Sequence, residues 1–333
     1  MKTILVTGGC GFIGSHFISM LDDSLYNVIV VDNLSNSNRQ VIDNLKKITS
    51  IEIEFQEVDL LDIESIKHIF RSRTIDHVVH FAGLKSVAES LLYPLRYYHN
   101  NVVATLHLLT CMKAYNVNNI IFSSSATVYG HQDQQPINED HPKHPINPYG
   151  RTKLAVEMML HDAHSSSGMG VVILRYFNPV GAHPSGFIGE SPRGQPNNLM
   201  PILLNVAARK AKYLNIFGDD YNTPDGTCLR DYIHVMDLAS AHIDAIKQLK
   251  LNEVTCLNVG TGKPTSVMQL LRTFEEVNKI KIPYKIVKRR EGDLAVCYAN
   301  AHLAYDRLRW KSNLTIEDAC RDAWRAYKNL KVN

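Results

Sequence analysis

Tyr149 and Lys153 are the two residues whose types and spacing best suit a chemical step in this chain. Pro148 precedes them and suits the first turn of a helix, which residues 154–160 continue. Residues four apart share a helix face, so the phenol and the ammonium are expected to point the same way. A nearby cation favours the phenolate and lowers the pKa of a tyrosine from its ordinary value near ~10. The pair therefore suits removal of a proton from a hydroxyl while hydride leaves the same carbon, although such spacing also arises by chance on amphipathic helices.

A glycine-rich turn near the N-terminus supplies a context for this pair. Residues 3–7 predict a buried parallel strand that runs into Gly8, Gly11 and Gly14, and a helix follows at about 15–21. Glycines let the backbone approach a pyrophosphate at the helix N-terminus. The next strand, residues 27–31, ends in Asp32, 18 residues after Gly14. A carboxylate there accepts the ribose hydroxyls of NAD and repels the extra phosphate of NADP, so the combination predicts an NAD site.

Strands and helices continue to alternate along the first half of the chain. We expect strands at about 52–60, 76–81, 119–122 and 171–177, and helices at 63–70 and 94–114. This order predicts an α/β fold with a Rossmann-type, doubly wound parallel sheet. Ligands bind outside the carboxyl ends of such strands. Asp32, Lys85, Ser125 and Phe177 lie at predicted strand ends, so we expect them on one rim with the glycine turn.

The pattern changes after Phe177. Residues 178–198 are rich in Gly, Pro and Asn, and the segment is too long for a plain connection, which favours a functional loop. Helices are expected at 200–212, 237–250, 267–277 and from 316, with strands at 214–217 and 256–260. We therefore expect an NAD-binding Rossmann domain over residues 1–177. Residues 178–333 would form a smaller mixed α/β substrate domain, with segments returning to the first.

Composition excludes several functional classes. The apolar share of 45% and charged share of 21% are ordinary for a globular protein. A net charge of +3 without a basic stretch interleaved with aromatics argues against a nucleic-acid partner. The six cysteines are scattered and His141 and His144 lack a third ligand, so we expect reduced thiols and no metal site. A signal peptide and a stretch of ~20 apolar residues are both lacking, which predicts a cytoplasmic protein with no membrane partner.

With these residues in view, the chain resembles the UDP-glucose 4-epimerase family of extended short-chain dehydrogenases/reductases, whose GxxGxxG spacing it shares. The resemblance covers nearly the whole length. It rests on these stretches: TGGCGFIGSH (7–16), VDNLSNS (31–37), HFAGLKSVAES (80–90), FSSSATVYG (122–130), PYGRTK (148–153), RYFNPVGAHPSG (175–186), PNNLMP (196–201), RDYIHVMDLA (230–239) and RREGDL (289–294).

The resemblance implies reversible C4 epimerisation of UDP-glucose and UDP-galactose, through a 4-keto intermediate and transient hydride transfer to tightly bound NAD. Tyr149 would be the base, Lys153 its pKa-lowering partner on the nicotinamide ribose, and Ser125 a hydrogen-bonding partner of the sugar 4-hydroxyl. Implied NAD contacts are these three and Gly8, Gly11, Phe12, Ile13, Gly14, Asp32, Asn33, Leu34, Ser35, Asn36, Ser37, Asp59, Leu60, Phe81, Ala82, Gly83, Leu84, Lys85, Asn100 and Phe177.

The resemblance also implies a site for the UDP-sugar. Its contacts would be Lys85, Ser125, Tyr149, Asn178, Asn198, Leu199, Asn215, Ile216, Phe217, Arg230, Arg290, Asp293 and Cys297. Arg230 and Arg290 make physical sense as pyrophosphate clamps, because a guanidinium offers paired donors to phosphate oxygens. Surface salt bridging is the plainer alternative for both arginines.

Cys297 departs from the pattern of family members that use hexoses alone, which carry a bulky tyrosine at this position. A cysteine leaves room for a C2 N-acetyl group, and in the family a small residue here accompanies use of UDP-N-acetylhexosamines. We therefore expect UDP-GlcNAc and UDP-GalNAc to be substrates too. The alternative is that Tyr298 or another neighbour refills the space.

Two other functions are compatible with a Rossmann sheet. A nucleotide-sugar 4,6-dehydratase needs an acidic pair where this chain has Ser125, Ala126 and Thr127, and no Asp or Glu lies there. A non-catalytic NAD-binding regulator commonly lacks the Tyr/Lys pair that is present here. Family members usually form homodimers through two long helices, here about 94–114 and 149–163. Galactose catabolism and surface polysaccharide synthesis both remain open as the pathway served.

Overall fold

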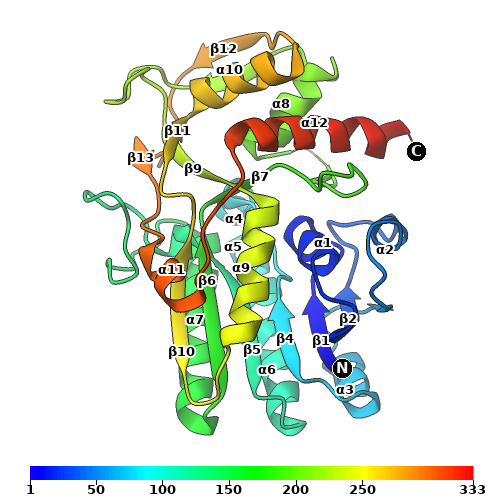
Figure 1. Ribbon diagram of the computed structural model, residues 1–333. Helices are drawn as coiled ribbons and strands as arrows, with labels where there is room; N and C mark the ends of the chain where they lie inside the picture. The colour runs from blue at the N-terminus through cyan, green and yellow to red at the C-terminus, as the bar shows by residue number, and fades with distance from the viewer. Residues whose placement is uncertain (195, 291, 333) are drawn as a thin grey trace.

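A seven-stranded parallel β-sheet forms the centre of the larger part of the molecule (Figure 1). The computed structural model describes residues 1–194, 196–290 and 292–332. The strand order is β10-β6-β5-β4-β1-β2-β3, so it reverses between β1 and β4, where ligands bind in open α/β sheets. The strands are β1 Lys2–Thr7, β2 Tyr26–Asp32, β3 Ile53–Glu57, β4 His77–His80, β5 Asn119–Ser125, β6 Gly170–Tyr176 and β10 Val254–Val259.

Helices cover both faces of this sheet, which explains why its strands are apolar throughout. Alternate residues of β1 enter different cores: Ile4 and Val6 pack on one side and Leu5 on the other. The first face is covered by α1 (Phe12–Ser19), α2 (Gln40–Leu45), α9 (Val235–Gln248) and α11 (His302–Leu308). The second is covered by α3 (Ile63–Ser72), α6 (Ala104–Ala114) and α7 (Pro148–Ser167). The predicted doubly wound parallel sheet is confirmed.

The long helix expected at 94–114 is present but is not uniform. It consists of α5 (Pro94–Tyr97), a π-helical segment (Tyr98–Val103) and α6, and α4 (Val87–Leu92) precedes it. Asn101 lies in the π-helical segment, and its side chain bonds the backbone of Leu84 in both directions, at 2.8 and 3.0 Å. The π-helical segment thereby fastens the loop after β4, which carries predicted site residues, to the helix beneath it.

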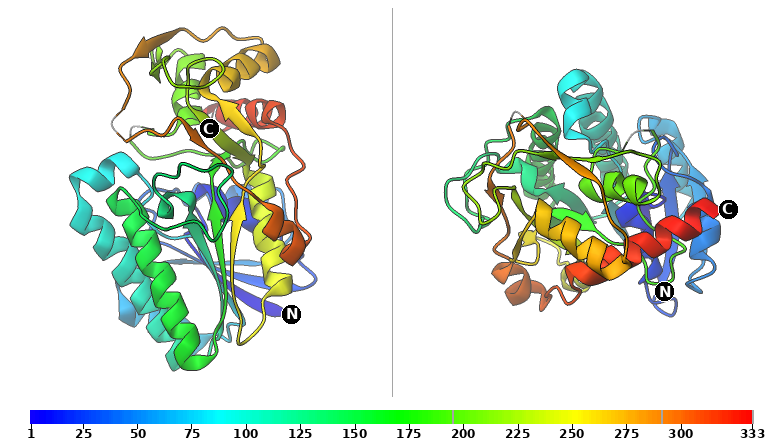
Figure 2. Two further views of the ribbon diagram at one scale, coloured as in Figure 1. Left: turned by 90° about the vertical axis from the view of Figure 1, so that its left-hand side faces the viewer. Right: turned by 90° about the horizontal axis from the view of Figure 1, so that it is seen from above.

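A smaller domain sits over the carboxyl ends of the large sheet (Figures 1 and 2). One sheet comprises β7 (Asn178–Val180), β9 (Leu229–His234), β11 (Pro264–Ser266) and β13 (Val296–Cys297). A second pairs β8 (Leu214–Phe217) with β12 (Tyr284–Val287) in parallel. Helices α8 (Leu199–Ala207), α10 (Val267–Asn278) and α12 (Ile316–Val332) complete a separate apolar core. In the described ranges, no helix is long and apolar enough to cross a membrane.

Candidate active site

The first turn of α7 brings the tyrosine and the lysine to the rim of the large sheet. Pro148 occupies the first turn of the helix, and the Asn147 side chain caps it by accepting a hydrogen bond from Gly150 N at 2.8 Å. A Cβ at Gly150 would meet Thr127 O at 2.7 Å, so this turn packs tightly against the segment after β5. Lys153 Nζ lies 6.0 Å from the centre of the Tyr149 ring and donates to Ser123 O at 2.8 Å.

Ser125 ends β5 and hydrogen-bonds Tyr149. Its Oγ accepts from Thr127 N at 3.2 Å and from Thr127 Oγ1 at 3.0 Å. Because both of those bonds use the serine oxygen as acceptor, its own proton is available to the Tyr149 oxygen. The three side chains thus form a connected set in which Ser125 can donate to either a phenolate or a substrate oxygen.

The electrostatics of Tyr149 differ from the expectation that Lys153 lowers its pKa. Tyr149 is 6% exposed, and burial raises its pKa to about 12, with the hydrogen bond from Ser125 acting in the opposite direction. Burial also lowers the pKa of Lys153 to about 8, while the carboxylate of Glu157 raises it. The shift for the protein on its own is therefore opposite to the expected lowering, because burial, the largest cause, disfavours the charged phenolate.

The glycine turn is shaped for close approach of a ligand backbone. Gly8 has φ +69°, and a Cβ there would meet Ala82 N at 2.6 Å. A Cβ at Gly14 would meet Gly8 O at 2.5 Å, so the first turn of α1 lies directly on the loop. Side chains at these positions would push apart β1, α1 and the loop after β4. The resulting cradle opens on the α1 N-terminus, whose free N–H groups suit a pyrophosphate.

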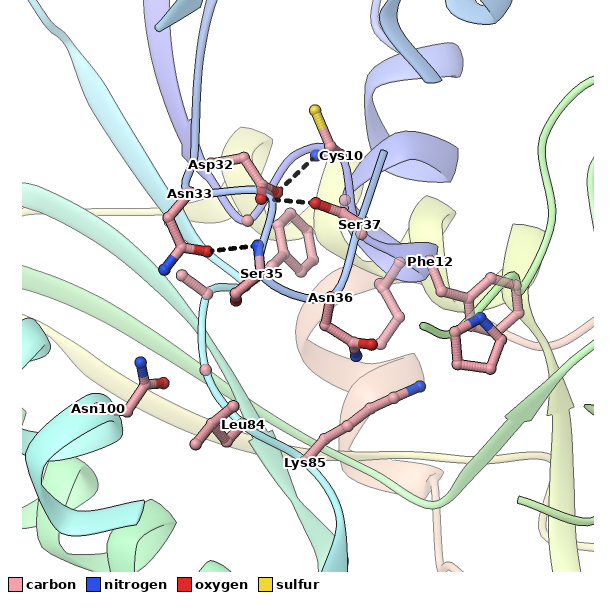
Figure 3. Close-up of a pocket in the computed structure, with 18 of the residues that line it drawn as sticks. Cys10, Phe12, Asp32, Asn33, Ser35, Asn36, Ser37, Leu84, Lys85 and Asn100 are labelled. Carbon is pink, nitrogen blue, oxygen red and sulfur yellow. Dashed lines mark hydrogen bonds between the residues drawn. The ribbon is translucent and has the colours of Figure 1, made fainter. Parts of the chain in front are cut away.

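Asp32 at the end of β2 is held by the same turn (Figure 3). Its Oδ2 accepts from Cys10 N at 3.0 Å, and its Oδ1 accepts from Leu34 N at 2.9 Å and Ser37 Oγ at 2.7 Å. A carboxylate offers about four acceptor positions, so one remains for a ribose hydroxyl. The nearby Asn33 amide donates to Asp59 Oδ2 at 2.9 Å. These residues offer donors and acceptors that fit the adenosine half of NAD.

A cleft of about 1350 Å³, open to solvent, joins the glycine turn to the tyrosine and lysine. Most of the predicted cofactor residues line it: Gly8, Gly11, Phe12, Ile13, Gly14, Asp32, Asn33, Ser35, Asn36, Ser37, Asp59, Leu60, Phe81, Ala82, Gly83, Leu84, Lys85, Asn100, Tyr149 and Lys153. Leu34, Ser125 and Phe177 are not in its lining. Leu34 contributes its backbone to Asp32, and Phe177 packs in a small core with Val128.

Several lining residues had no predicted role: Cys10, Val31, Asn38, Val41, Val58, Ala104, Tyr176, Gly189, Glu190, Ser191 and Pro192. Glu190 is the most notable, because its Oε1 accepts from Lys85 Nζ at 2.7 Å and from Asn198 Nδ2 at 3.0 Å. Glu190 thereby connects Lys85, which was predicted to contact both NAD and the UDP-sugar, to Asn198, which was predicted to contact the UDP-sugar alone. In the sequence, the Gly- and Pro-rich composition of residues 178–198 indicated a functional loop but did not single out Glu190.

Four predicted substrate residues gather in the smaller domain. The Arg290 guanidinium lies 4.5 Å from the Phe217 ring centre, and its Nε donates to Asp293 Oδ2 at 3.0 Å. Arg230 Nη2 lies 3.8 Å from Asp293 Oδ1. One carboxylate therefore holds both arginines, which fits a paired phosphate clamp. Glu291 of the same motif lies outside the described residues.

The remaining predicted substrate residues are more dispersed. Asn178 is exposed on β7, and Leu199 begins α8. Asn215 and Ile216 lie on β8, where Asn215 is exposed, whereas the Ile216 side chain is buried in the core of the smaller domain. The structure thus brings the Ile216 backbone to this region but not its side chain.

Cys297 lies on β13, paired with Arg230 on β9, and packs against the core that contains Phe177. Tyr298 follows it, and the Tyr298 backbone bonds Gln135 Oε1 and Ile137 N at 3.1 and 3.0 Å. Adjacent residues of an extended chain project to opposite sides, so these bonds hold Tyr298 away from the side that Cys297 faces. This geometry argues against refilling of the space by Tyr298.

The doubly wound sheet, the glycine turn with Asp32, and the Tyr149/Lys153 pair on the same rim define a short-chain dehydrogenase/reductase. A family model described as GDP-mannose 4,6 dehydratase matches residues 5–323. UDP-glucose 4-epimerase of Bacillus subtilis is 48% identical over 99% of this chain and 98% of its own length. The chain belongs to the UDP-glucose 4-epimerase family.

Solved structures agree with this placement. UDP-glucose 4-epimerase of Stenotrophomonas maltophila, with bound NAD and formylated UDP-arabinopyranose, superposes with a TM-score of 0.97 at 43% identity, over 100% of this chain and 99% of that one. The UDP-Glc/GlcNAc 4-epimerase of Campylobacter jejuni has a TM-score of 0.86 at 37% identity, over 99% and 100% of the two chains.

Proposed function

We propose that the protein is an NAD-dependent isomerase that interconverts UDP-glucose and UDP-galactose at C4. The observation that carries this is the set Ser125, Tyr149 and Lys153 beside a cleft whose other end holds Asp32 and the glycine turn. NAD, when bound, supplies a hydride acceptor and the positive charge of the oxidised nicotinamide. That charge and the ammonium of Lys153 both favour the phenolate of Tyr149.

The residues then have distinct tasks. Tyr149 takes the proton of the sugar 4-hydroxyl and later returns it, while Ser125 donates a hydrogen bond to the reacting oxygen. Arg230 and Arg290, held by Asp293, grip the UDP pyrophosphate. This remote binding energy retains the 4-keto sugar while its ring turns over and hydride returns to the other face. Residues 1–177 would bind NAD and residues 178–333 the UDP-sugar.

The elimination route of a 4,6-dehydratase has no support in this site. It requires an acid and a base next to the sugar C5 and C6. The residues after β5 are Ala126 and Thr127, neither of which is acidic, and Thr127 donates hydrogen bonds to Ser125. The buried Ser125–Tyr149–Lys153 set likewise gives no reason to favour a regulator without catalysis.

Use of UDP-GlcNAc and UDP-GalNAc extends the proposal. A cysteine at position 297 occupies much less volume than a tyrosine would, and the Campylobacter jejuni relative is named for both sugar types. Cys297→Tyr should lower turnover of UDP-GalNAc by roughly 100-fold while UDP-Gal turnover changes little. Cys297→Ala is the matched control and should keep both activities. Equal loss on both sugars in Cys297→Tyr would refute the pocket assignment.

The first experiment supplies UDP-Gal and UDP-GalNAc separately to purified protein without added NAD and follows the anomeric proton by NMR. Turnover of both is the expected result. Turnover of UDP-Gal alone would remove the extension to N-acetyl sugars. Turnover of neither, even with NAD supplied, or loss of water in the product by mass spectrometry, would overturn the proposed reaction.

We also propose that the protein is a cytoplasmic homodimer. Exposed apolar side chains, 56–81% accessible, are Leu91 and Leu92 on α4, Tyr93 between α4 and α5, and Leu95 on α5, and Met158 on α7 is 61% exposed. Helices α4, α5 and α7 contact one another (Figure 2). An interface that covers these helices would bury the exposed apolar side chains, which supports a second copy of the chain as the partner. Leu95→Glu should convert the dimer into a monomer in light scattering. Leu251→Glu, at an exposed leucine elsewhere, should leave it intact.

A further inference from the structure

Two buried charged residues, Glu157 and Arg175, do not line the cleft and have no role in the proposed reaction. Glu157 lies one helical turn after Lys153, and Arg175 lies on β6, 2% and 3% exposed. Arg175 Nη2 donates to Glu157 Oε2 at 2.6 Å and Arg175 Nε to Oε1 at 3.0 Å. Ser124 Oγ also donates to Glu157 Oε1, at 2.5 Å. This bidentate ion pair is fully buried directly behind the catalytic lysine.

Further contacts fix the guanidinium from the other side. Arg175 Nη1 donates to Tyr129 Oη at 2.9 Å and to Glu139 O at 3.2 Å. Tyr129 Oη in turn donates to Asn258 Oδ1 at 2.6 Å. Strands β5, β6 and β10 and helix α7 are therefore tied together by one buried polar network. A buried ion pair stabilises a fold little more than apolar residues would, so its presence here suggests another task.

That task concerns Lys153, whose ammonium is almost as buried. The described contacts of Lys153 Nζ are the donation to Ser123 O and positions over the Phe122 and Tyr149 rings, at 4.7 and 6.0 Å. None of these partners carries a negative charge. Residues four apart on a helix lie about 6 Å apart at Cβ, so the carboxylate of Glu157 is the anion next to this ammonium.

We infer that Glu157, held by Arg175 and Ser124, is a positioning residue that keeps Lys153 charged in its buried site. Arg175 sets the strength of this effect, because it neutralises most of the carboxylate and prevents Glu157 from reaching Lys153 directly. The inference rests on the proposed role of Lys153 in the epimerase reaction. It adds a second layer of residues that tune the base without touching substrate or cofactor.

Burial favours the neutral form of the other titratable groups around this network. Burial lowers the pKa of His80 to about 3, and the charge of Lys153 adds to that lowering. Burial raises the pKa of Tyr176 well above its ordinary value. Burial raises the pKa of Cys256 to about 12, against the effect of Arg175. Burial also raises the pKa of Glu139, whose Oε1 accepts from Asn258 N at 2.7 Å.

The two single variants should move the pH dependence of kcat in opposite directions. Activity needs the ammonium form of Lys153, whose pKa near 8 limits it on the alkaline side. Glu157→Gln removes the anion and leaves Arg175 positive, so the alkaline limb should move about one to two pH units toward acid. Arg175→Met leaves an unneutralised carboxylate beside Lys153, so the alkaline limb should move toward higher pH.

The test measures kcat for UDP-Gal against pH on the NAD-containing enzyme, together with thermal unfolding. The double variant Glu157→Gln/Arg175→Met removes both charges and should fold even if a single variant does not. Its alkaline limb should move toward acid by less than that of Glu157→Gln. Asp237→Asn is the control. The buried Asp237 carboxylate accepts hydrogen bonds from Asn313 N and Leu314 N and is far along the chain from Lys153. Its loss should lower the unfolding temperature without moving the alkaline limb of the pH profile.

Three outcomes would overturn the inference: coincident alkaline limbs for all variants, shifts of both single variants in the same direction, or a double variant identical to the wild type when neither single variant folds. A purely structural pair would lower the unfolding temperature and leave the pH profile unchanged. Inactive wild-type protein would instead contradict the proposed function, so the two failures are distinguishable.

Discussion

Ser125→Ala tests the electrostatics of the site most directly. Ser125 donates to Tyr149, and this bond lowers the pKa of a phenol that burial raises to about 12. A hydrogen bond to a charged group contributes about 1.5–3 kcal/mol. Its removal should disfavour the phenolate by that amount and lower kcat roughly 10- to 150-fold. The acid limb of the pH profile should move toward higher pH, because more hydroxide is needed to form the base.

The assay is kcat for UDP-Gal against pH, with NAD content measured on the same samples. Thr127→Val is the matched control, since Thr127 Oγ1 donates a hydrogen bond to Ser125 Oγ at 3.0 Å and not to Tyr149. It should lower kcat much less, because Thr127 N still bonds Ser125. An unchanged acid limb in Ser125→Ala, or an equal effect of both variants, would contradict the assignment of Ser125 as the donor that tunes Tyr149.

Three further outcomes follow from the site. Tyr149→Phe should retain NAD and lower kcat by about 10²- to 10⁴-fold, measured by the NMR assay; a smaller loss would remove Tyr149 as the base. Asp32→Asn removes the carboxylate that repels a 2′-phosphate, so the preference for NAD over NADP should fall about tenfold or more in reconstitution of stripped enzyme. Gly14→Ala places a Cβ 2.5 Å from Gly8 O, so NAD occupancy and unfolding temperature should both fall, and normal values of both would show that the turn adapts.

The parallel sheet and its rim were predictable because they depend on local signals. Apolar runs, a glycine turn and polar residues at strand ends are visible in sequence, and parallel topology brings those ends to one edge. Asp32, Lys85 and Tyr149 accordingly all line the cleft. Short strands of the smaller domain were not predicted: they include β9 and β13, and β13 is two residues long. Such strands are defined by their partners, and residue pattern alone does not reveal them.

Glu190 shows a different limit. It belongs to a loop that sequence marks as functional through its Gly, Pro and Asn content. Its contacts are to Lys85, 105 positions earlier, and to Asn198 on its own loop. Loop conformation depends on the surfaces that the loop crosses, so no periodicity indicates which residue turns inward. The buried network of Glu157 and Arg175 was not predicted either, because their pairing links a helix to a strand 18 positions away and depends on how the two pack.

The pKa of Tyr149 shows why spacing predicts neighbours better than energies. The i, i+4 rule placed Lys153 beside Tyr149, and the two are close. The sign of the net shift depends on burial, and burial is a property of the packed sheet, helix α7 and the segment after β5 together. Both groups are at least 94% buried, and burial raises the pKa of Tyr149 to about 12 and lowers the pKa of Lys153 to about 8. Positive charge close to the phenol favours its phenolate form, and the oxidised nicotinamide ring of NAD carries such a charge. Because burial disfavours the phenolate, Tyr149 depends on bound oxidised NAD to become a base. Proton removal is therefore favoured only when the acceptor of the hydride is also present.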